Sequence, residues 1–573
     1  SDAKKKEMEN SRLAYTKIVE TVLLFGQFGL SLRGNDSDDD SCFKKFLKFR
    51  AKDVPELHWW LEKPGYKWLH HDIINELLQM LSTDVLNRFL SDIKAARYFS
   101  VIMDETADIS RQEQVSISLR ITTTDLETEE IFMGFCHTPN TKSETLFNIL
   151  KDVFTRFHLP ISNLRGQCYD GAAAMSGKSS GLQTRIKNVA PKALFVHCTA
   201  HSLNLVVQDS LRNIQIVNSF IGISKDLITY IRDSPKRVEA FKQIQQELQS
   251  WCMRVKSLKT IFANYEAIVM FLDECKTEKT CDSGKAEGLL KFLEGFEFYF
   301  LLALSIKILE RVEILNCELQ KKDLSINESH DMVKIMKDGI STMRDSGFDS
   351  LWEVAVKEAK KLDLNDPMLP RHRRAPKRLK TANAHVFKDP ESYYKKIYLV
   401  TVDQLLFSLN ERFQSETMDF LNNCENFIIG NDADLASIVE FYDDDLDIDR
   451  LELHRDMFID MIKAKDLKVT NLKDAVNVLK NDKAMVDCVS ELVSLVKLIL
   501  TIPSSTCTAE RSFSALRRLK TYLNSTMLQQ RMNSIAILHV HREIAEKIDI
   551  DKLLNDFISK NKNRRSTFSM LNE

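Results

Sequence analysis

Three acidic side chains occur in settings that suit metal-assisted phosphoryl chemistry. Asp104 closes the apolar run YFSVIMDE, Asp170 closes a second short apolar run, and Glu510 opens a helical pattern much later in the chain. Carboxylate oxygen is the ligand that Mg²⁺ and Mn²⁺ prefer, and two such ions can stabilise both the attacking and the leaving oxygen of a phosphodiester. The sequence therefore predicts a catalytic site in which Asp104, Asp170 and Glu510 bind two Mg²⁺ or Mn²⁺ ions.

Each aspartate also has a simpler interpretation when it is taken alone. Asp104 suits a turn at the end of a strand, and Asp170 followed by Gly171 suits a turn equally well. Their order with Glu510, and the motifs that surround all three residues, favour the metal site.

The segment between residues 96 and 214 predicts the elements that position these acids. The run QVSISLRIT at 114–122 alternates apolar and polar side chains with a period of two, as a strand does. Further strands are expected at 99–103, 131–136, 164–169 and 193–197, and helices at 143–157, about 175–189 and 200–211. This order, βββαβαβα with acids at the ends of the first and fourth strands, is that of a ribonuclease-H-like core.

Helical patterns rich in charge surround this core. Residues 1–95 predict a helical N-terminal region, and residues 215–490 predict a large all-α insertion. The first part of the core then spans 96–214, and 491–573 supply the rest of it together with Glu510. The predicted fold class is an α/β ribonuclease-H-like core interrupted by an all-α insertion, and the scarcity of glycine (16) and proline (11) favours a helix-rich chain.

Length and composition limit the classes of function. A chain of 573 residues predicts several domains. The net charge of 80 − 82 = −2 means that nucleic-acid binding must come from local patches. The 11 cysteines include no CxxC pair, which is typical of reduced thiols in a cytosolic or nuclear protein. Apolar runs are too short to span a bilayer, so no membrane partner is expected. The missing initial Met indicates a fragment with an upstream part.

The segment GAAAMSGKS at 171–179 is superficially like a phosphate-binding loop. That motif has four residues between its first glycine and the Gly-Lys pair, whereas five stand here. We therefore expect no nucleotide cofactor.

Four ordered motifs resemble those of the hobo/Activator-type (hAT) DNA transposases. They are FSVIMDETADIS, CYDGAAAMSGKSSGLQ, VHCTAHSLNLVV and IPSSTCTAERSFSALRRLKTYLNSTM. The likeness covers nearly the whole chain and is closest to the animal branch that includes domesticated relatives with MYM-type and THAP-type zinc fingers. The ordered set is highly specific, although no single motif is.

The resemblance implies metal-dependent DNA cleavage and strand transfer in the nucleus. It assigns Asp104, Asp170 and Glu510 to the acidic triad that holds the metals, and it implies DNA and a second copy of the chain as partners. The segment TAERSFS and the helix after it match a C-terminal dimerisation region.

Cys198 and His201 match a CxxH motif of the family, in which the histidine lies beside the scissile phosphate. Their spacing would also suit half of a zinc site, but no second Cys/His pair is near in sequence. A cysteine at a strand-to-helix junction is also commonly a small buried residue. We favour an active-site role for His201.

DNA-binding residues are expected in two segments of the insertion. Trp251, with Arg254 near it, matches an aromatic residue that stacks on a flipped base in the family, although a core position is the simpler interpretation. In the family an arginine precedes this tryptophan, whereas Ser250 stands here and removes a guanidinium that could pair with DNA. The second segment, which also suits a nuclear-import signal or a solvated loop, contributes Arg371, Arg373, Arg374, Lys377 and Arg378.

Two functions of different classes remain open from the sequence. The intact acidic trio favours a transposase. Ser250 and the near-neutral charge favour a domesticated, catalytically silent regulator that associates with DNA and dimerises. In either case, site-specific DNA recognition would come from a zinc-binding module upstream of this chain.

Overall fold

A computed structural model describes residues 2–33, 41–234, 237, 255–277, 283–321, 324–369, 387–521 and 527–568. The chain divides into two compact units. The core unit comprises Ser1–Cys198, Lys322–Ile326 and Phe420–Glu573, and the helical unit comprises Thr199–Lys321 and Asn327–Asp419. Each unit is described separately below.

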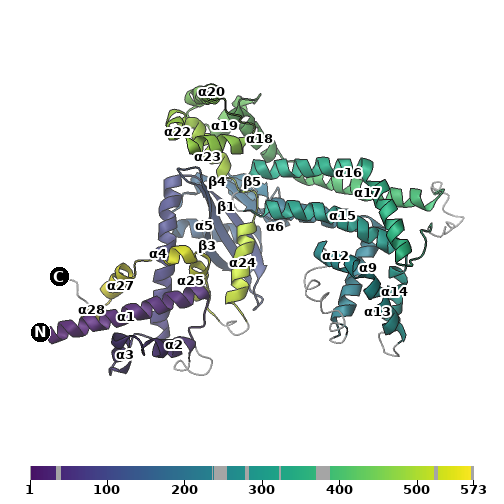
Figure 1. The fold of residues 1–573 in the computed structure, drawn as a ribbon. Helices are drawn as coiled ribbons and strands as arrows, with labels where there is room; N and C mark the ends of the chain where they lie inside the picture. Colours follow the sequence, from purple (N-terminus) through teal and green to yellow (C-terminus); the bar gives the residue numbers. More distant parts are fainter. Residues whose placement is uncertain are drawn as a thin grey trace. The chain divides into compact units, whose positions relative to one another are not determined.

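A mixed five-stranded sheet forms the centre of the core unit, with strand order β3-β2-β1-β4-β5 (Figure 1). The strands are β1 (Phe99–Ala107), β2 (Glu113–Thr122), β3 (Thr128–Thr138), β4 (Leu164–Tyr169) and β5 (Leu194–His197). β1, β2 and β3 pair antiparallel, whereas β4 pairs parallel with both β1 and β5. Together with the helices between the strands, this sheet confirms the predicted α/β core.

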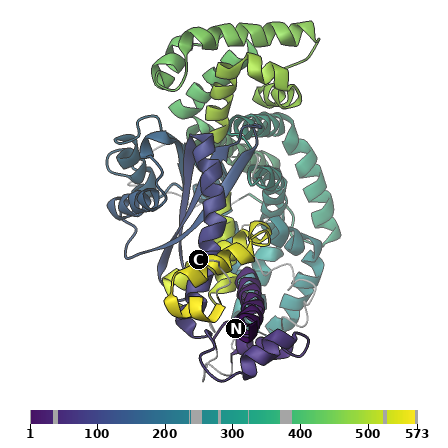
Figure 2. The ribbon, with the colours of Figure 1, turned by 90° about the vertical axis from the view of Figure 1, so that its left-hand side faces the viewer.

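One face of the sheet is apolar and packs against three long helices. These are α1 (Asp2–Phe28), α4 (His71–Ala96) and α25 (Gln529–Val540). They contact one another, and α4 and α25 contact the strands. Val101, Ile117 and Leu119 point to this side and belong to one large buried cluster with residues of all three helices. Figure 2 shows α4 running along this face. The sheet is therefore anchored on this side by burial of apolar surface.

The opposite face carries the polar half of the alternating strand β2, and it is buried as well. A period of two is typical of a sheet with one face in water, but every residue of β2 after Glu113 is buried. Two helices cover this face, α23 (Ser490–Thr501) and α24 (Cys507–Leu519). Hydroxyl pairs join them to β2, with Ser116 Oγ 2.8 Å from Ser512 Oγ and Thr122 Oγ1 2.9 Å from Thr501 Oγ1.

The remaining helices complete the two units. In the core unit they are α2 (Cys42–Arg50), α3 (Pro55–Glu62), α5 (Ser143–Arg156), α6 (Ala173–Ser176), α7 (Leu182–Lys187), α19 (Leu435–Tyr442), α20 (Ile448–Ala464), α21 (Leu472–Asn481), α22 (Lys483–Cys488), α26 (Arg542–Ala545), α27 (Ile550–Ser559) and α28 (Lys562–Phe568), together with α18 (Glu416–Ile429) from Phe420 onward. In the helical unit they are α8 (Thr199–Arg212), α9 (Gln215–Arg232), α12 (Val255–Ala263), α13 (Tyr265–Thr277), α14 (Ser283–Leu293), α15 (Phe296–Leu319), α16 (Ile326–Lys361) and α17 (Pro390–Phe413). Within the described residues, no helix is long and apolar enough to cross a membrane.

One helix differs from the prediction. The single helix expected at about 175–189 is wrong, because the segment forms two short helices, α6 and α7. Between them the backbone folds tightly, so that a Cβ on Gly181 would lie 2.5 Å from the amide nitrogen of Gly177. Only glycine permits so close an approach of two backbone segments.

The division into units follows packing, whereas the predicted boundaries follow sequence pattern. The helical unit ends at Asp419, and the helices α20, α21 and α22 pack on α23 in the core unit. The predicted insertion, by contrast, runs from 215 to 490.

Candidate active site

Parallel pairing places two of the predicted acids side by side. β1 and β4 are in register from Ser100 to Ile102, with Ile102 opposite Cys168. Two residues further along stand Asp104 and Asp170. Asp170 directly follows the carboxyl end of β4, whereas Asp104, predicted to close its strand, lies three residues before the end of β1 because pairing with β2 continues to Ala107. Ligand sites in open α/β sheets form at such ends.

The third acid is brought to the same place by α24. Asp104 pairs with Ser116 across the β1–β2 ladder, and Ser116 bonds to Ser512 of α24. Glu510 lies two residues before Ser512, in the first turn of that helix. Figure 1 shows α24 lying along the strands. Residues more than 400 positions apart therefore converge at one end of the sheet.

The pKa of Asp104 reflects its burial and the nearby charges of the other acids. The pKa of Asp104 is raised to about 7, mainly by burial and also by the negative charges of Glu510 and Asp170, against the opposing effect of a hydrogen bond from the Glu105 amide. The pKa of Glu105 is also raised to about 7, by burial and by the charges of Asp170 and Glu113. Among the described residues, no cation is a cause of either shift. The site is thus an uncompensated concentration of carboxylates.

Each aspartate keeps one carboxylate oxygen for other ligands. Asp104 Oδ1 accepts from the Glu105 amide at 2.9 Å, and Asp170 Oδ1 accepts from the Ala172 amide at 3.1 Å. The latter bond is the local turn that the simpler interpretation of Asp170 expected. Within the described residues, no hydrogen bond reaches Oδ2 of either side chain. An oxygen-only donor set with unneutralised charge fits a hard divalent cation.

The trio is spread more widely than a single-ion cluster. Within the described residues, the group whose ligand atoms all lie within 4.8 Å of one another is His70, His71 and Asp72. The ligand oxygens of Asp104, Asp170 and Glu510 do not all lie within this distance of one another.

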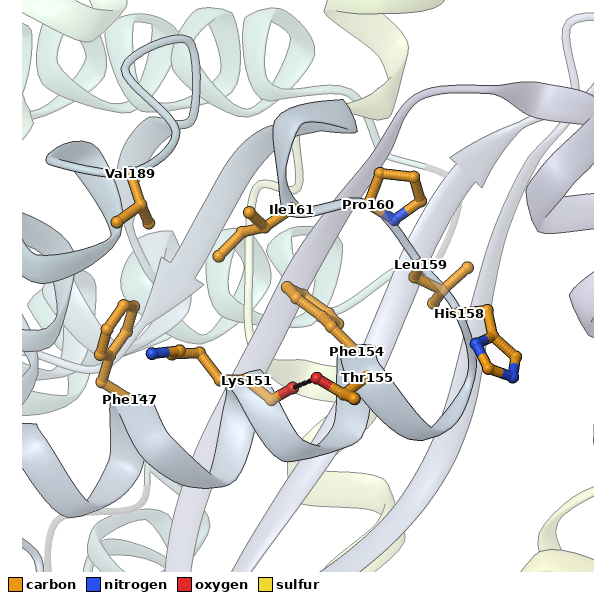
Figure 3. Close-up of a pocket in the computed structure, with 9 residues that line it drawn as sticks. All are labelled: Phe147, Lys151, Phe154, Thr155, His158, Leu159, Pro160, Ile161 and Val189. Carbon is orange, nitrogen blue, oxygen red and sulfur yellow. Dashed lines mark hydrogen bonds between the residues drawn. The ribbon is translucent and has the colours of Figure 1, made fainter.

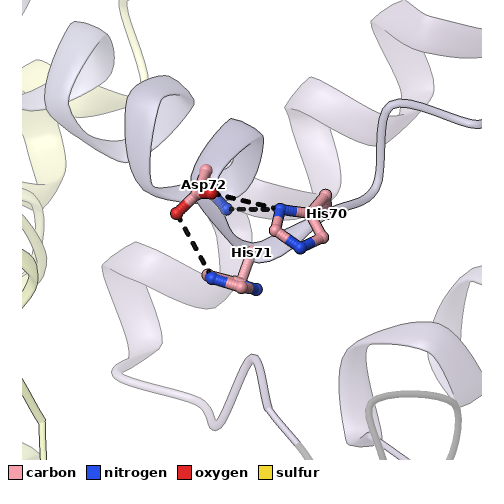
Figure 4. A group of neighbouring side chains, drawn as sticks. All are labelled: His70, His71 and Asp72. Atoms are coloured by element: carbon pink, nitrogen blue, oxygen red, sulfur yellow. Dashed lines mark hydrogen bonds and ion pairs between the residues drawn. The ribbon is translucent and has the colours of Figure 1, made fainter.

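The His70–His71–Asp72 group itself is better explained as a helix cap (Figure 4). His70 is the N-cap of α4 and its side chain accepts from the Asp72 amide. Asp72 lies 3.3 Å from one ring nitrogen of each histidine. All three side chains are exposed. The positive end of a helix dipole favours the carboxylate there and disfavours a metal cation.

A buried ion pair fixes the start of α24, and sequence analysis missed it. Arg120 is 1% exposed; its Nη1 lies 2.8 Å from Glu130 Oε1, and its Nε donates to the Leu500 carbonyl at 3.0 Å. The hydroxyl of Thr508 donates to the other oxygen of Glu130. The available signals were Arg120 within the predicted strand 114–122 and Glu130 directly before the predicted strand 131–136. This network ties the first turn of α24 to β2 and β3.

Cys198 performs a second positioning role. Its Sγ accepts from the amide of Thr506 at 3.3 Å and from its hydroxyl at 3.2 Å. Thr506 is the residue before α24, so a fully buried thiol at the end of β5 helps to place the helix that carries Glu510. This geometry agrees with the interpretation of Cys198 as a small buried residue.

The other predicted site residues belong to the helical unit or lie outside the described residues. His201 is half-buried in the first turn of α8, in the helical unit. The residues predicted to bind DNA lie outside the described residues: Trp251, Arg254, Arg371, Arg373, Arg374, Lys377 and Arg378. Their roles stay predictions.

A separate apolar pocket lies beside α5 (Figure 3). Its volume is about 470 Å³, and its wall includes Phe147, Phe154 and Ile161 with Lys151 at the edge. None of the clustered acids lines it. It has no part in the chemistry of the carboxylate site.

Comparison with known families decides the relationship of the chain. Residues 1–181 match the family described as "ZMYM1/FAM200, RNase-like domain", residues 196–266 match "ZBED1 RNase-like helical domain", and residues 459–544 match "hAT family C-terminal dimerisation region". Along these three segments the chain is similar to hAT-related, transposase-derived proteins. The match at 459–544 includes α24 and supports self-association of the chain.

Two curated relatives align with nearly the full chain. They are the human and mouse proteins named "52 kDa repressor of the inhibitor of the protein kinase". The human protein is 20% identical and the mouse protein 21% identical, over 96% of this chain and 77% of each relative. The relationship extends over both units described above.

Proposed function

We propose that the core unit is a metal-dependent DNA cleavage and strand-transfer site. The observation that carries the proposal is the convergence of Asp104, Asp170 and Glu510, two from adjacent parallel strands and one from a helix that arrives from the other end of the chain. Burial, together with the charges of Glu510 and Asp170, raises the pKa of Asp104, and bound divalent cations would relieve the repulsion between the carboxylates.

The residues have distinct tasks in this proposal. Asp104 and Asp170 would hold two Mg²⁺ or Mn²⁺ ions between the strand ends, and Glu510 would close the site from α24. Such ions, when bound, lower the pKa of water and neutralise charge on a phosphodiester. A water oxygen then attacks phosphorus, the bond to the 3′-oxygen breaks, and that oxygen leaves with a proton. In strand transfer the freed 3′-hydroxyl attacks a second phosphodiester in the same way.

A second function is favoured by other observations. The aligned human and mouse relatives are named as repressors, and Ser250 replaces an arginine of the transposase pattern. In this alternative the chain is a nuclear, DNA-associated regulator that self-associates through its C-terminal region without cleaving DNA. The basic run at 371–380 would then serve nuclear import or DNA contact.

Cleavage of supercoiled plasmid in Mn²⁺ tests the proposal. The native chain should nick and join DNA, and Asp170→Asn should reduce the rate by at least about 100-fold because a lost metal ligand removes several kcal/mol of transition-state stabilisation. Asp556→Asn is the matched control, since Asp556 is an exposed aspartate on α27. Equal cleavage by native and Asp170→Asn proteins would overturn the assignment. DNA binding with no cleavage by any of the three proteins would favour the regulator.

A further inference from the structure

We propose that α24 carries a contact surface for DNA phosphates that leads away from the acidic site. The surface, called here the arginine track, consists of Arg511, Ser514, Arg517 and Arg518. It deepens the proposed function and rests on it, because the track is useful only if a DNA strand reaches the acids.

The exposed residues of α24 form one face. Within Cys507–Leu519, the exposed residues are Glu510, Arg511, Ser514, Arg517 and Arg518, and all the others are buried. The spacing of one, four, seven and eight residues from Glu510 places them on one side of a helix. The arginines therefore share a face with the predicted metal ligand.

The charges of Arg517 and Arg518 are not neutralised by any residue that the structure describes. Arg517 and Arg518 form no ion pair with any part of the chain that the structure describes, and the Nη2 of Arg511 donates to the hydroxyl of Thr508 at 3.0 Å. Lys520, two residues beyond Arg518, is different: its Nζ lies 2.6 Å from Asp108 Oδ2 and both side chains are buried. Lys520 therefore has a structural role, whereas Arg517 and Arg518 face solvent.

The direction of α24 relates the track to the acids. Ser512 bonds to Ser116 beside Asp104, and Lys520 bonds to Asp108 just beyond the end of β1. The helix therefore runs along β1 from the acidic site outward. From Glu510 to Arg517 the rise is about 10 Å, which equals roughly three base-pair steps of 3.4 Å along a DNA strand. A phosphate held at the acids would have its neighbours against the arginines.

The chemistry of both partners requires such a surface. A cluster of carboxylates repels DNA, and the net charge of the chain is only −2, so nearby cations must offset the repulsion. Guanidinium groups bind phosphate oxygens through paired N–H donors, and the small Ser514 at the centre of the track lets a backbone approach the helix. Arginines in a last helical turn also interact with the helix dipole, which would affect stability and not DNA binding.

Salt-dependent DNA binding without metal tests the track independently of catalysis. The binding of the full chain to a 30-base-pair duplex is measured by fluorescence anisotropy in EDTA over a series of NaCl concentrations. Log K falls as log [NaCl] rises. Arg517→Gln/Arg518→Gln should make this fall less steep, reducing the magnitude of the slope by about 2, and should weaken binding at least ~10-fold, because two phosphate contacts are lost. Arg517→Lys/Arg518→Lys should keep most of the slope. Lys562→Gln/Arg565→Gln, which removes two exposed cations from α28, is the matched control.

The outcomes separate this inference from the proposed function. An unchanged slope in Arg517→Gln/Arg518→Gln, an equal loss in the α28 control, or no binding by the native chain would overturn the track. If the native chain cleaves plasmid DNA through Asp170 while the slope is unchanged, the proposed function stands and the track alone is wrong. A lower thermal midpoint with unchanged DNA binding would assign the arginines to the helix dipole.

Discussion

The two faces of the central sheet are both buried, but they are held by different interactions. On one face Leu119 and its neighbours pack with α1, α4 and α25 through apolar surface. On the other face, the next residue, Arg120, joins Glu130, and serine and threonine hydroxyls bond to α23 and α24. Apolar packing tolerates small shifts, whereas hydrogen bonds and ion pairs require defined geometry. The face that positions Glu510 is the one built from directional contacts.

Breaking the polar face should give the largest loss of stability. Arg120→Met should lower the free energy of unfolding by about 3–5 kcal/mol, because Glu130 is then left buried without a cation. Adding Glu130→Leu should restore much of that loss, since no charge is then buried. Urea unfolding of the single and double variants measures both effects.

The adjacent Leu119 sharpens the comparison as a control. Leu119→Ala should cost a similar ~2–5 kcal/mol through the cavity it leaves in the apolar face, but Glu130→Leu should not restore it. If Glu130→Leu restored the stability of both Arg120→Met and Leu119→Ala, or of neither, the distinction between the two faces would be contradicted.

A smaller effect concerns the acids that the polar face positions. The pKa of Asp104 is raised from 3.8 to about 7, so the folded state holds this proton more tightly than the unfolded state. The free energy of unfolding therefore falls as pH rises from about 4 to 7, and the ionised carboxylate costs stability above that window. Asp104→Asn removes this cost.

The predicted gain is on the order of 1 kcal/mol at pH 8, after allowance for solvent screening, and it should vanish near pH 4. Urea unfolding of native and Asp104→Asn proteins across this range measures it. A variant less stable than the native chain at pH 8 and equally stable at pH 4 would reverse the sign and contradict the account.

Sequence patterns predicted the strands well because their signals are local. The alternation at 114–122 matches β2, which spans Glu113–Thr122, and the apolar runs before Asp104 and Asp170 became adjacent strands. An alternation with a period of two shows which residues share a face of the sheet, but it does not show what covers that face. The bond between Ser116 and Ser512 joins residues nearly 400 positions apart, which no local pattern predicts. The role of the Arg120–Glu130 pair likewise depends on α24, which lies over it in the folded chain. Likewise, the close approach of Gly177 and Gly181 depends on backbone geometry that helical periodicity does not report.

Binding of Mn²⁺ tests most directly whether the three acids form one metal site. Electron paramagnetic resonance at pH 7.5 should detect Mn²⁺ bound by the native chain and by the control Asp556→Asn. Asp170→Asn should weaken this binding at least ~10-fold, because a carboxylate ligand is lost where no other group compensates. Equal affinity in all three proteins would contradict a metal site at Asp104, Asp170 and Glu510.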